Sequence, residues 1–172
     1  MNFINQLVTS SKAWLALAGS ALALELCAFY FQYVLNLLPC IMCVYQRLAI
    51  LAILLAGLIG AAAPKYWFVR LTAFALWGAA AIWGLLIALE HVEMQTSTTS
   101  FFFGCEIVPN FPSWAPLHEW LPFMFEASGD CGDIKWRFFG YSMPQVMVAV
   151  FVGYIAILAV MIFGRLIDKK VP

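Results

Sequence analysis

Four long apolar stretches dominate the hydrophobic pattern of this chain. They cover approximately residues 13–35, 44–63, 69–89 and 146–163. A helix needs roughly 20 predominantly apolar residues to cross a bilayer, and each stretch is near that length. A long, more polar segment, about residues 91–142, separates the third stretch from the fourth. The pattern predicts an all-α membrane protein: a four-transmembrane-helix bundle forming a single integral membrane domain over residues 1–172.

The composition agrees with a membrane protein. Of the 172 residues, 65% are hydrophobic and 10% are charged, whereas a soluble domain usually has about 25% charged residues. One soluble core of this size cannot bury so many apolar side chains, so lipid must solvate part of the surface. Nine basic and nine acidic residues give a formal net charge of zero, so nothing in the composition indicates nucleic acid as a partner.

Basic residues gather on one side of the expected bundle. Lys65 and Arg70 lie in the short link between the second and third stretches, and the two ends of the chain carry Lys12, Arg165, Lys169 and Lys170. The opposite side carries Lys135 and Arg137 against seven acidic residues between positions 90 and 133. Because cytoplasmic segments are enriched in Lys and Arg, we expect a multi-pass protein with both termini cytoplasmic and the long loop facing outward.

Part of the long loop is rich in aromatic residues and proline. Residues 111–125 are too polar and too often interrupted by proline to cross the membrane. Their aromatic side chains suit a short amphipathic helix that lies at the membrane interface. A folded loop with a small core of its own fits the same residues equally well.

The second stretch opens on a closely spaced cysteine pair. Pro39 precedes Cys40 and Cys43, and because proline favours the first turn of a helix, both cysteines should lie in or just before that turn, at the outer end. A helix N-terminus stabilises an anion and so lowers a cysteine pKa. A spacing of three puts the two sulfurs on one helical face, close enough for a redox disulfide. Arg47 shares that face and can stabilise a thiolate or the oxyanion of a reduced ligand.

Other interpretations of these residues stay open. A lone CxxC motif can bind metal, but zinc takes four ligands, the chain has no second CxxC, and its histidines are His91 and His118; we therefore expect a redox pair and no metal. Arg47 can also be a structural residue that extends to the interface. His91 follows the third stretch at the same outer depth as Cys40, where it is either a ligand-site residue or a helix-end cap.

The other three cysteines are placed differently. Cys105 and Cys131 both lie in the outward loop, where an oxidising environment favours a disulfide. Such a bond is either a permanent staple or an exchange site, and the exposed Gly-rich and Asp-rich flanks of Cys131 do not decide between them. Cys27 sits alone in an apolar run and reads as an inert, unpaired, small hydrophobic residue.

Taken together, these residues resemble the bacterial disulfide bond formation protein DsbB family. The similarity covers essentially the whole chain, and the ordered set of motifs is more specific than any one of them. The motifs are residues 22–26 (LALEL), Pro39, Cys40, Cys43, Tyr45 and Arg47, then Glu90 and His91, Phe111, Pro112 and Trp114, residues 127–131 (ASGDC), and residues 143–145 (MPQ).

The resemblance implies an activity for this chain. Members of the family are inner-membrane thiol–disulfide oxidoreductases that reoxidise DsbA, a periplasmic thioredoxin-fold protein, and pass the electrons to ubiquinone or menaquinone. By position, Cys40 and Cys43 correspond to the pair that exchanges electrons with quinone. Cys105 and Cys131 correspond to the loop pair, with Cys105 forming the mixed disulfide with the partner. Arg47 and His91 correspond to cofactor-binding positions, and the relay proceeds by thiolate attack.

Two further points follow from the resemblance. Gln46 stands where some family members have glutamate, and we assign it no role. Glu25, an acid near the middle of the first stretch, is by default a functional candidate; it either helps deliver protons to reduced quinone or, as we favour, is neutral and hydrogen-bonded within the bundle.

Two rival functions remain. A vitamin K epoxide reductase-like membrane thiol oxidoreductase would share four helices, a CxxC and a quinone, but that family generally carries its quinone-proximal CxxC near the last helix, whereas here it opens the second. A non-enzymatic tetraspan adaptor with a structural loop disulfide would explain the long loop, but would give no reason for a CxxC next to Arg47 at a membrane edge.

Overall fold

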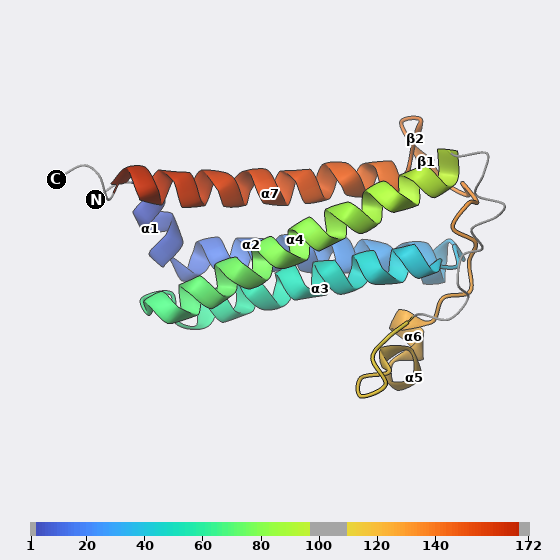
Figure 1. Ribbon diagram of the computed structural model, residues 1–172, viewed down its shortest axis with the longest axis horizontal. Coiled ribbons are helices and arrows are strands. Elements are labelled where there is room, and N and C mark those ends of the chain that lie inside the picture. Colours follow the sequence, from blue (N-terminus) through green and yellow to red (C-terminus); the bar gives the residue numbers. More distant parts are fainter. Residues whose placement is uncertain (1–2, 97–109, 169–172) are drawn as a thin grey trace.

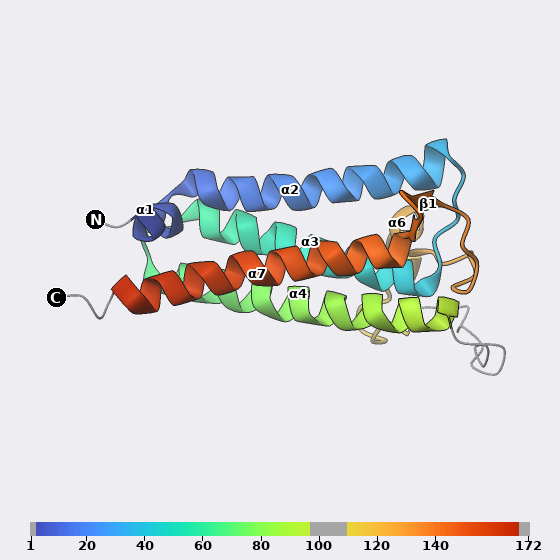
Figure 2. The ribbon, with the colours of Figure 1, turned by 90° about the horizontal axis from the view of Figure 1, so that it is seen from above.

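Four long helices run side by side in the computed structural model, which describes residues 3–96 and 110–168. The first is α2 (Ser11–Phe29), which continues as the π-helix η1 (Tyr30–Val34). The others are α3 (Ile41–Ala62), α4 (Trp67–Thr96) and α7 (Met143–Asp168). Each is long and apolar enough to cross a membrane. The predicted four-helix membrane fold is therefore confirmed (Figures 1 and 2).

The helices pack in chain order. α2 packs on α3, α3 on α4 and α4 on α7. Small residues bring the backbones close, as is typical between membrane helices: a Cβ added to Gly57 of α3 would come within 2.7 Å of the backbone nitrogen of Ala18 in α2. On the side where α2 faces α7, Ser20 Oγ and Tyr154 OH share a hydrogen bond of 3.0 Å. The packing thus leaves the α2–α7 side as the least tightly closed part of the bundle.

Helix α4 is longer than its apolar stretch. The stretch ends near Leu89, but the helix continues to Thr96 because residues 90–95 include Glu, Met and Gln, which favour a helix without requiring lipid. His91 is therefore inside the helix and buried, so its interpretation as a helix-end cap is wrong. The extra turns carry α4 past the depth at which the cysteine pair begins α3.

The aromatic part of the loop forms two short helices, α5 (Leu117–Trp120) and α6 (Pro122–Phe125). The break falls at Leu121, whose backbone is not helical because proline follows it. Met124 and Phe125 are buried against Val44 of α3, so this segment packs on the bundle and does not build a separate core. Trp120 is exposed, as suits a segment that faces lipid headgroups.

Three small elements complete the described chain. α1 (Phe3–Thr9) packs against α7 at the end of the bundle where α3 connects to α4. At the opposite end, β1 (Arg137–Phe138) and β2 (Tyr141–Ser142) pair antiparallel as a hairpin that leads into α7. The CxxC motif, α5, α6 and this hairpin therefore share one end of the molecule (Figure 1).

Candidate functional site

Cys40 is the N-cap residue of α3. Its backbone is extended (φ −84°, ψ 171°), and its Sγ accepts a 3.4 Å hydrogen bond from the backbone N–H of Cys43. A cap side chain of this kind satisfies one of the unpaired N–H groups of the first turn. The prediction that the cysteines lie in or just before the first turn of the second span is therefore confirmed.

The two sulfurs of the pair are in direct contact. Cys40 and Cys43 are free thiols whose Sγ atoms lie 3.0 Å apart. The hydrogen bond between the thiols of Cys40 and Cys43, together with burial, raises the pKa of Cys40. These two effects outweigh the lowering of the pKa that a helix N-terminus would cause. These contacts favour the protonated form of Cys40, whose sulfur stays in contact with that of Cys43.

His91 of α4 joins the pair from the side. Its Nε2 lies 3.6 Å from Cys40 Sγ, and its Nδ1 lies 3.3 Å from Nε2 of Gln46. All three side chains are buried. The structure thus brings together His91 and the cysteine pair, as their common depth predicted, and adds Gln46, to which the sequence assigned no role.

Arg47 lies one turn further along α3. Its guanidinium donates to Gln32 Oε1 at 2.6 Å and to the carbonyl oxygens of Met124 at 3.0 Å and Ala28 at 3.4 Å. It also lies over the ring of Phe29. A buried guanidinium costs less when its N–H groups are paired. Arg47 therefore ties the end of α2 and the α6 segment to α3, a structural contribution that its position in the sequence alone does not reveal.

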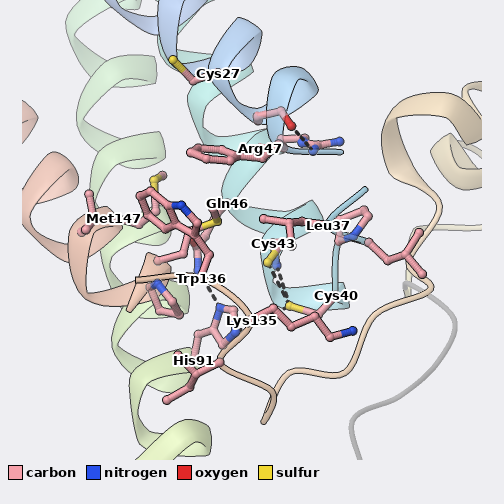
Figure 3. A pocket seen from close by; sticks show the side chains of 18 of the residues that line it. Cys27, Leu37, Cys40, Cys43, Gln46, Arg47, His91, Lys135, Trp136 and Met147 are labelled. Carbon is pink, nitrogen blue, oxygen red and sulfur yellow. Dashed lines mark hydrogen bonds between the residues drawn. The ribbon is translucent and has the colours of Figure 1, made fainter. Parts of the chain in front are cut away.

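A cavity of about 220 Å³ lies beside these residues, between α2 and α7 (Figure 3). All four long helices and the segment before α7 contribute to its walls, and most of the apolar side chains come from α2, α7 and the residues between α2 and α3. The polar groups Gln46, Arg47 and His91 and the thiol of Cys43 also line it. Small-molecule sites usually combine apolar walls with a few convergent polar groups. The cavity is the candidate ligand site.

The segment after Cys131 covers the cavity on its outer side. Trp136 packs against Phe31 of η1, with ring centroids 4.8 Å apart. Lys135 and Trp136 both line the cavity and are labelled in Figure 3. Trp136 could not be identified from the sequence, because nothing in its local pattern separates it from the other aromatic residues of the loop.

Cys131 is held against the CxxC motif. It is disulfide-bonded, is 2% exposed and belongs to one buried cluster with Cys40. The backbone N–H groups of Ser128 and Gly129 both donate to the carbonyl oxygen of Pro39, each at 3.0 Å. A loop cysteine is thereby docked on the membrane-edge pair. The prediction for Cys105 lies outside the described residues.

Glu25 and Cys27 are among the residues of α2 that line the cavity. Glu25 is 3% exposed, and neither carboxylate oxygen has a hydrogen-bond partner in the described part of the chain, so the hydrogen-bonded state that we favoured is not found there. Cys27 is a free, exposed thiol, as expected, but the cavity reaches it as well.

Comparison with known proteins decides the family. The family model described as disulfide bond formation protein DsbB matches residues 10–161. The chain belongs to the DsbB family. It is 53% identical over 158 residues to disulfide bond formation protein B of Psychromonas ingrahamii, covering 92% of this chain and 85% of that protein. The proteins of the same name from Pseudoalteromonas translucida and Aeromonas hydrophila are 48% and 47% identical over 170 residues, with at least 98% of each chain covered.

DsbB proteins are quinone-dependent oxidoreductases of the membrane, which reoxidise DsbA and transfer the electrons to quinone. The predicted family, class of enzyme and activity are therefore confirmed, and DsbB membership favours this function over both rivals. The family assignment by itself does not say which residues of this chain perform the reaction. That question depends on the geometry described above.

Proposed function

We propose that this chain oxidises a DsbA-like, thioredoxin-fold periplasmic protein through two cysteine pairs in series, Cys105/Cys131 and then Cys40/Cys43. The observation that carries the proposal is the docking of Cys131 on Cys40, in one buried cluster next to the cavity. Because Cys131 is disulfide-bonded while Cys27, Cys40 and Cys43 are free thiols, the cysteine count supports Cys105 as its partner.

The relay consists of balanced thiol–disulfide exchanges. A thiolate of the reduced partner attacks the sulfur of Cys105, and Cys131 leaves as a thiolate. The second partner thiol then resolves the mixed disulfide, which yields an oxidised partner and two loop thiols. Cys131 next attacks the Cys40–Cys43 disulfide, with which it packs, and the loop disulfide re-forms as that pair is reduced. Each exchange moves two electrons and conserves the disulfide count.

The cavity fits a quinone as the final acceptor. Bound ubiquinone or menaquinone supplies the capacity to accept two electrons and two protons. Mostly apolar walls suit the ring and its tail, and Arg47 and His91 lie where they can donate hydrogen bonds to oxygen atoms of a bound ligand. Trp136 and Cys43 both line the cavity, so the indole can cover part of a bound acceptor and the thiol can reach it. The chain's own residues thus bind, orient and shield the acceptor.

The proposed location is the bacterial inner membrane with both termini cytoplasmic. Four spans return the chain to the side on which it began, and the end of the bundle that holds α1 also holds the last turns of α7. Lys65 in the α3–α4 link and Arg70 in the first turn of α4 lie at that same end. The cysteine pairs then face the periplasm, where a soluble dithiol protein can reach them.

Purified protein in detergent tests this function. The assay mixes the protein with a reduced DsbA-like protein and a soluble ubiquinone analogue, and quinone absorbance is followed. Cys43→Ser should abolish thiol-dependent loss of quinone, whereas the control His118→Ala, a change outside the cavity lining, should retain wild-type turnover. Full activity in the Cys43→Ser variant would overturn the proposal.

A further inference from the structure

The cysteine pair has a third side chain with metal-binding chemistry next to it. The two Sγ atoms are 3.0 Å apart, His91 Nε2 is 3.6 Å from Cys40 Sγ, and the three atoms all lie within 4.8 Å of one another. Thiolate sulfur and imidazole nitrogen are the ligands that Zn²⁺ most often takes in proteins. We propose that Cys40, Cys43 and His91 bind Zn²⁺ when the cysteine pair is reduced.

The spacing of the three atoms is close to that of a tetrahedral zinc site. Zn–S bonds of about 2.3 Å and a Zn–N bond of about 2.0–2.1 Å put the two sulfurs about 3.8 Å apart and each sulfur about 3.5 Å from the nitrogen. The contact between Cys40 and His91 already has this length. A small side-chain rotation of Cys43 would separate the sulfurs and bring its own sulfur closer to His91.

The surroundings supply what a three-residue site lacks. Three protein ligands leave one tetrahedral position for water or another small ligand, and the cavity borders Cys40, Cys43 and His91. A metal-bound histidine usually donates its other ring N–H to a neighbouring acceptor. The side-chain amide of Gln46 lies 3.3 Å from Nδ1 of His91, and with its oxygen turned toward that nitrogen it would be the acceptor. This would give Gln46 a function (Figure 3).

The charge balance makes the site dependent on redox state. Binding replaces two thiol protons with one Zn²⁺, so two protons leave, no electron moves, and the zinc with its two thiolates is neutral. A neutral centre is the form that a buried site at a membrane edge tolerates. The Cys40–Cys43 disulfide offers no thiolate and should not bind. Zinc would therefore hold the pair reduced and prevent it from giving up electrons. This inhibition rests on the proposed function, whereas zinc binding itself does not rest on it.

Zinc binding to full-length protein in detergent tests the inference. The protein is reduced with a phosphine in the absence of quinone, freed of reductant under anaerobic conditions, and titrated with Zn²⁺ against a chromophoric chelator. Reduced wild type should bind one Zn²⁺ tightly, and the oxidised protein none at that site. Cys43→Ser should lose the site. His91→Ala should weaken binding at least about tenfold, since even loss of a partner of a ligand commonly costs that much.

Matched variants and a structural readout exclude other sites. His118→Ala removes the other histidine, which lies in the short α5 helix, and should leave zinc affinity unchanged. X-ray absorption at the zinc edge should show two sulfurs at about 2.3 Å with nitrogen or oxygen completing the shell. Unchanged zinc binding in Cys43→Ser would assign the metal to other thiols and overturn the proposal. A zinc coordination shell without sulfur would also overturn the proposal. Equal zinc affinity in the His91→Ala and His118→Ala variants, when both retain wild-type helicity, would overturn it as well.

The zinc result is separable from the proposed function. If the protein binds zinc tightly but does not reduce quinone, the zinc site is supported and the proposed electron relay is contradicted. If the protein reduces quinone normally but does not bind zinc, the relay is supported and the zinc site is contradicted.

Discussion

The backbone N–H of Gly129 donates a 3.0 Å hydrogen bond to the carbonyl oxygen of Pro39, the residue immediately before the first cysteine of the CxxC motif. This contact joins two segments that are 90 positions apart in the sequence. It places the chain that leads into Cys131 on the backbone that leads into Cys40, so the docking of the loop and the position of the membrane-edge pair depend on each other.

Gly129 should be intolerant of any side chain. A Cβ at this position would overlap the carbonyl oxygen of Leu38, and relief of such an overlap costs about 1–3 kcal/mol. We expect Gly129→Ala to slow electron transfer from the loop pair to Cys40/Cys43 by roughly tenfold, since about 1.4 kcal/mol is a tenfold change. Stopped-flow reduction by a DsbA-like dithiol protein measures this rate.

The control for this change is Gly132→Ala. A Cβ at Gly132 would lie 3.6 Å from Asp130 Oδ1, which is an ordinary contact. The Gly132→Ala protein should therefore transfer electrons from the loop pair to Cys40/Cys43 at the wild-type rate. Equal rates in the Gly129→Ala protein and in wild type would show that this docking contact has no part in the relay.

Arg47→Lys should destabilise the protein. Lysine cannot reproduce a planar guanidinium that donates to Gln32, Met124 and Ala28 at once, and each buried carbonyl left without a donor costs about 1–3 kcal/mol. Thermal unfolding in detergent, followed by circular dichroism, should show a lower Tm. Arg70→Lys is the matched control, because Arg70 donates to one carbonyl, that of Pro64, at the other end of the bundle. If Arg70→Lys lowers the Tm as much as Arg47→Lys does, the stabilising role proposed for the hydrogen bonds of Arg47 is contradicted.

Glu25→Met should raise the Tm. The buried carboxyl has no hydrogen-bond partner in the described chain. Replacing it with an apolar group of similar length removes a desolvation penalty of about 1–3 kcal/mol, which should outweigh the loss of its attraction to Arg47. Glu25→Gln keeps a polar group at the same place and should not give that gain. A fall in Tm for Glu25→Met would mean that the carboxyl has a stabilising partner after all.

The sequence predicted the spans and the cysteine pair because those features are local. Apolar length reveals a membrane helix, and proline before Cys40 reveals a helix start. The length of α4 was underestimated because the apolar signal ends at Leu89, although helix propensity continues beyond it. The partial polarity of residues 90–96 marks the membrane edge and not the end of the helix.

Contacts between distant segments could not be predicted in the same way. Gln32 and Gln46 look like ordinary polar residues near a membrane edge, and only the packing of helices shows that one accepts from Arg47 and the other approaches His91. The position of Trp136 over Phe31 depends on where the loop lies. The residues that carry chemistry could be identified by type and spacing, whereas the residues that support and cover them could not.

A single-turnover experiment can show whether the Cys40/Cys43 pair gives electrons to quinone without help from the loop pair. A Cys105→Ser/Cys131→Ser double variant is reduced, freed of reductant and mixed with ubiquinone without any partner protein. We expect the loss of one quinone per chain, with a Cys40–Cys43 disulfide detected by mass spectrometry. Failure to reduce quinone by a folded double variant whose Cys40 and Cys43 thiols are reduced would contradict it.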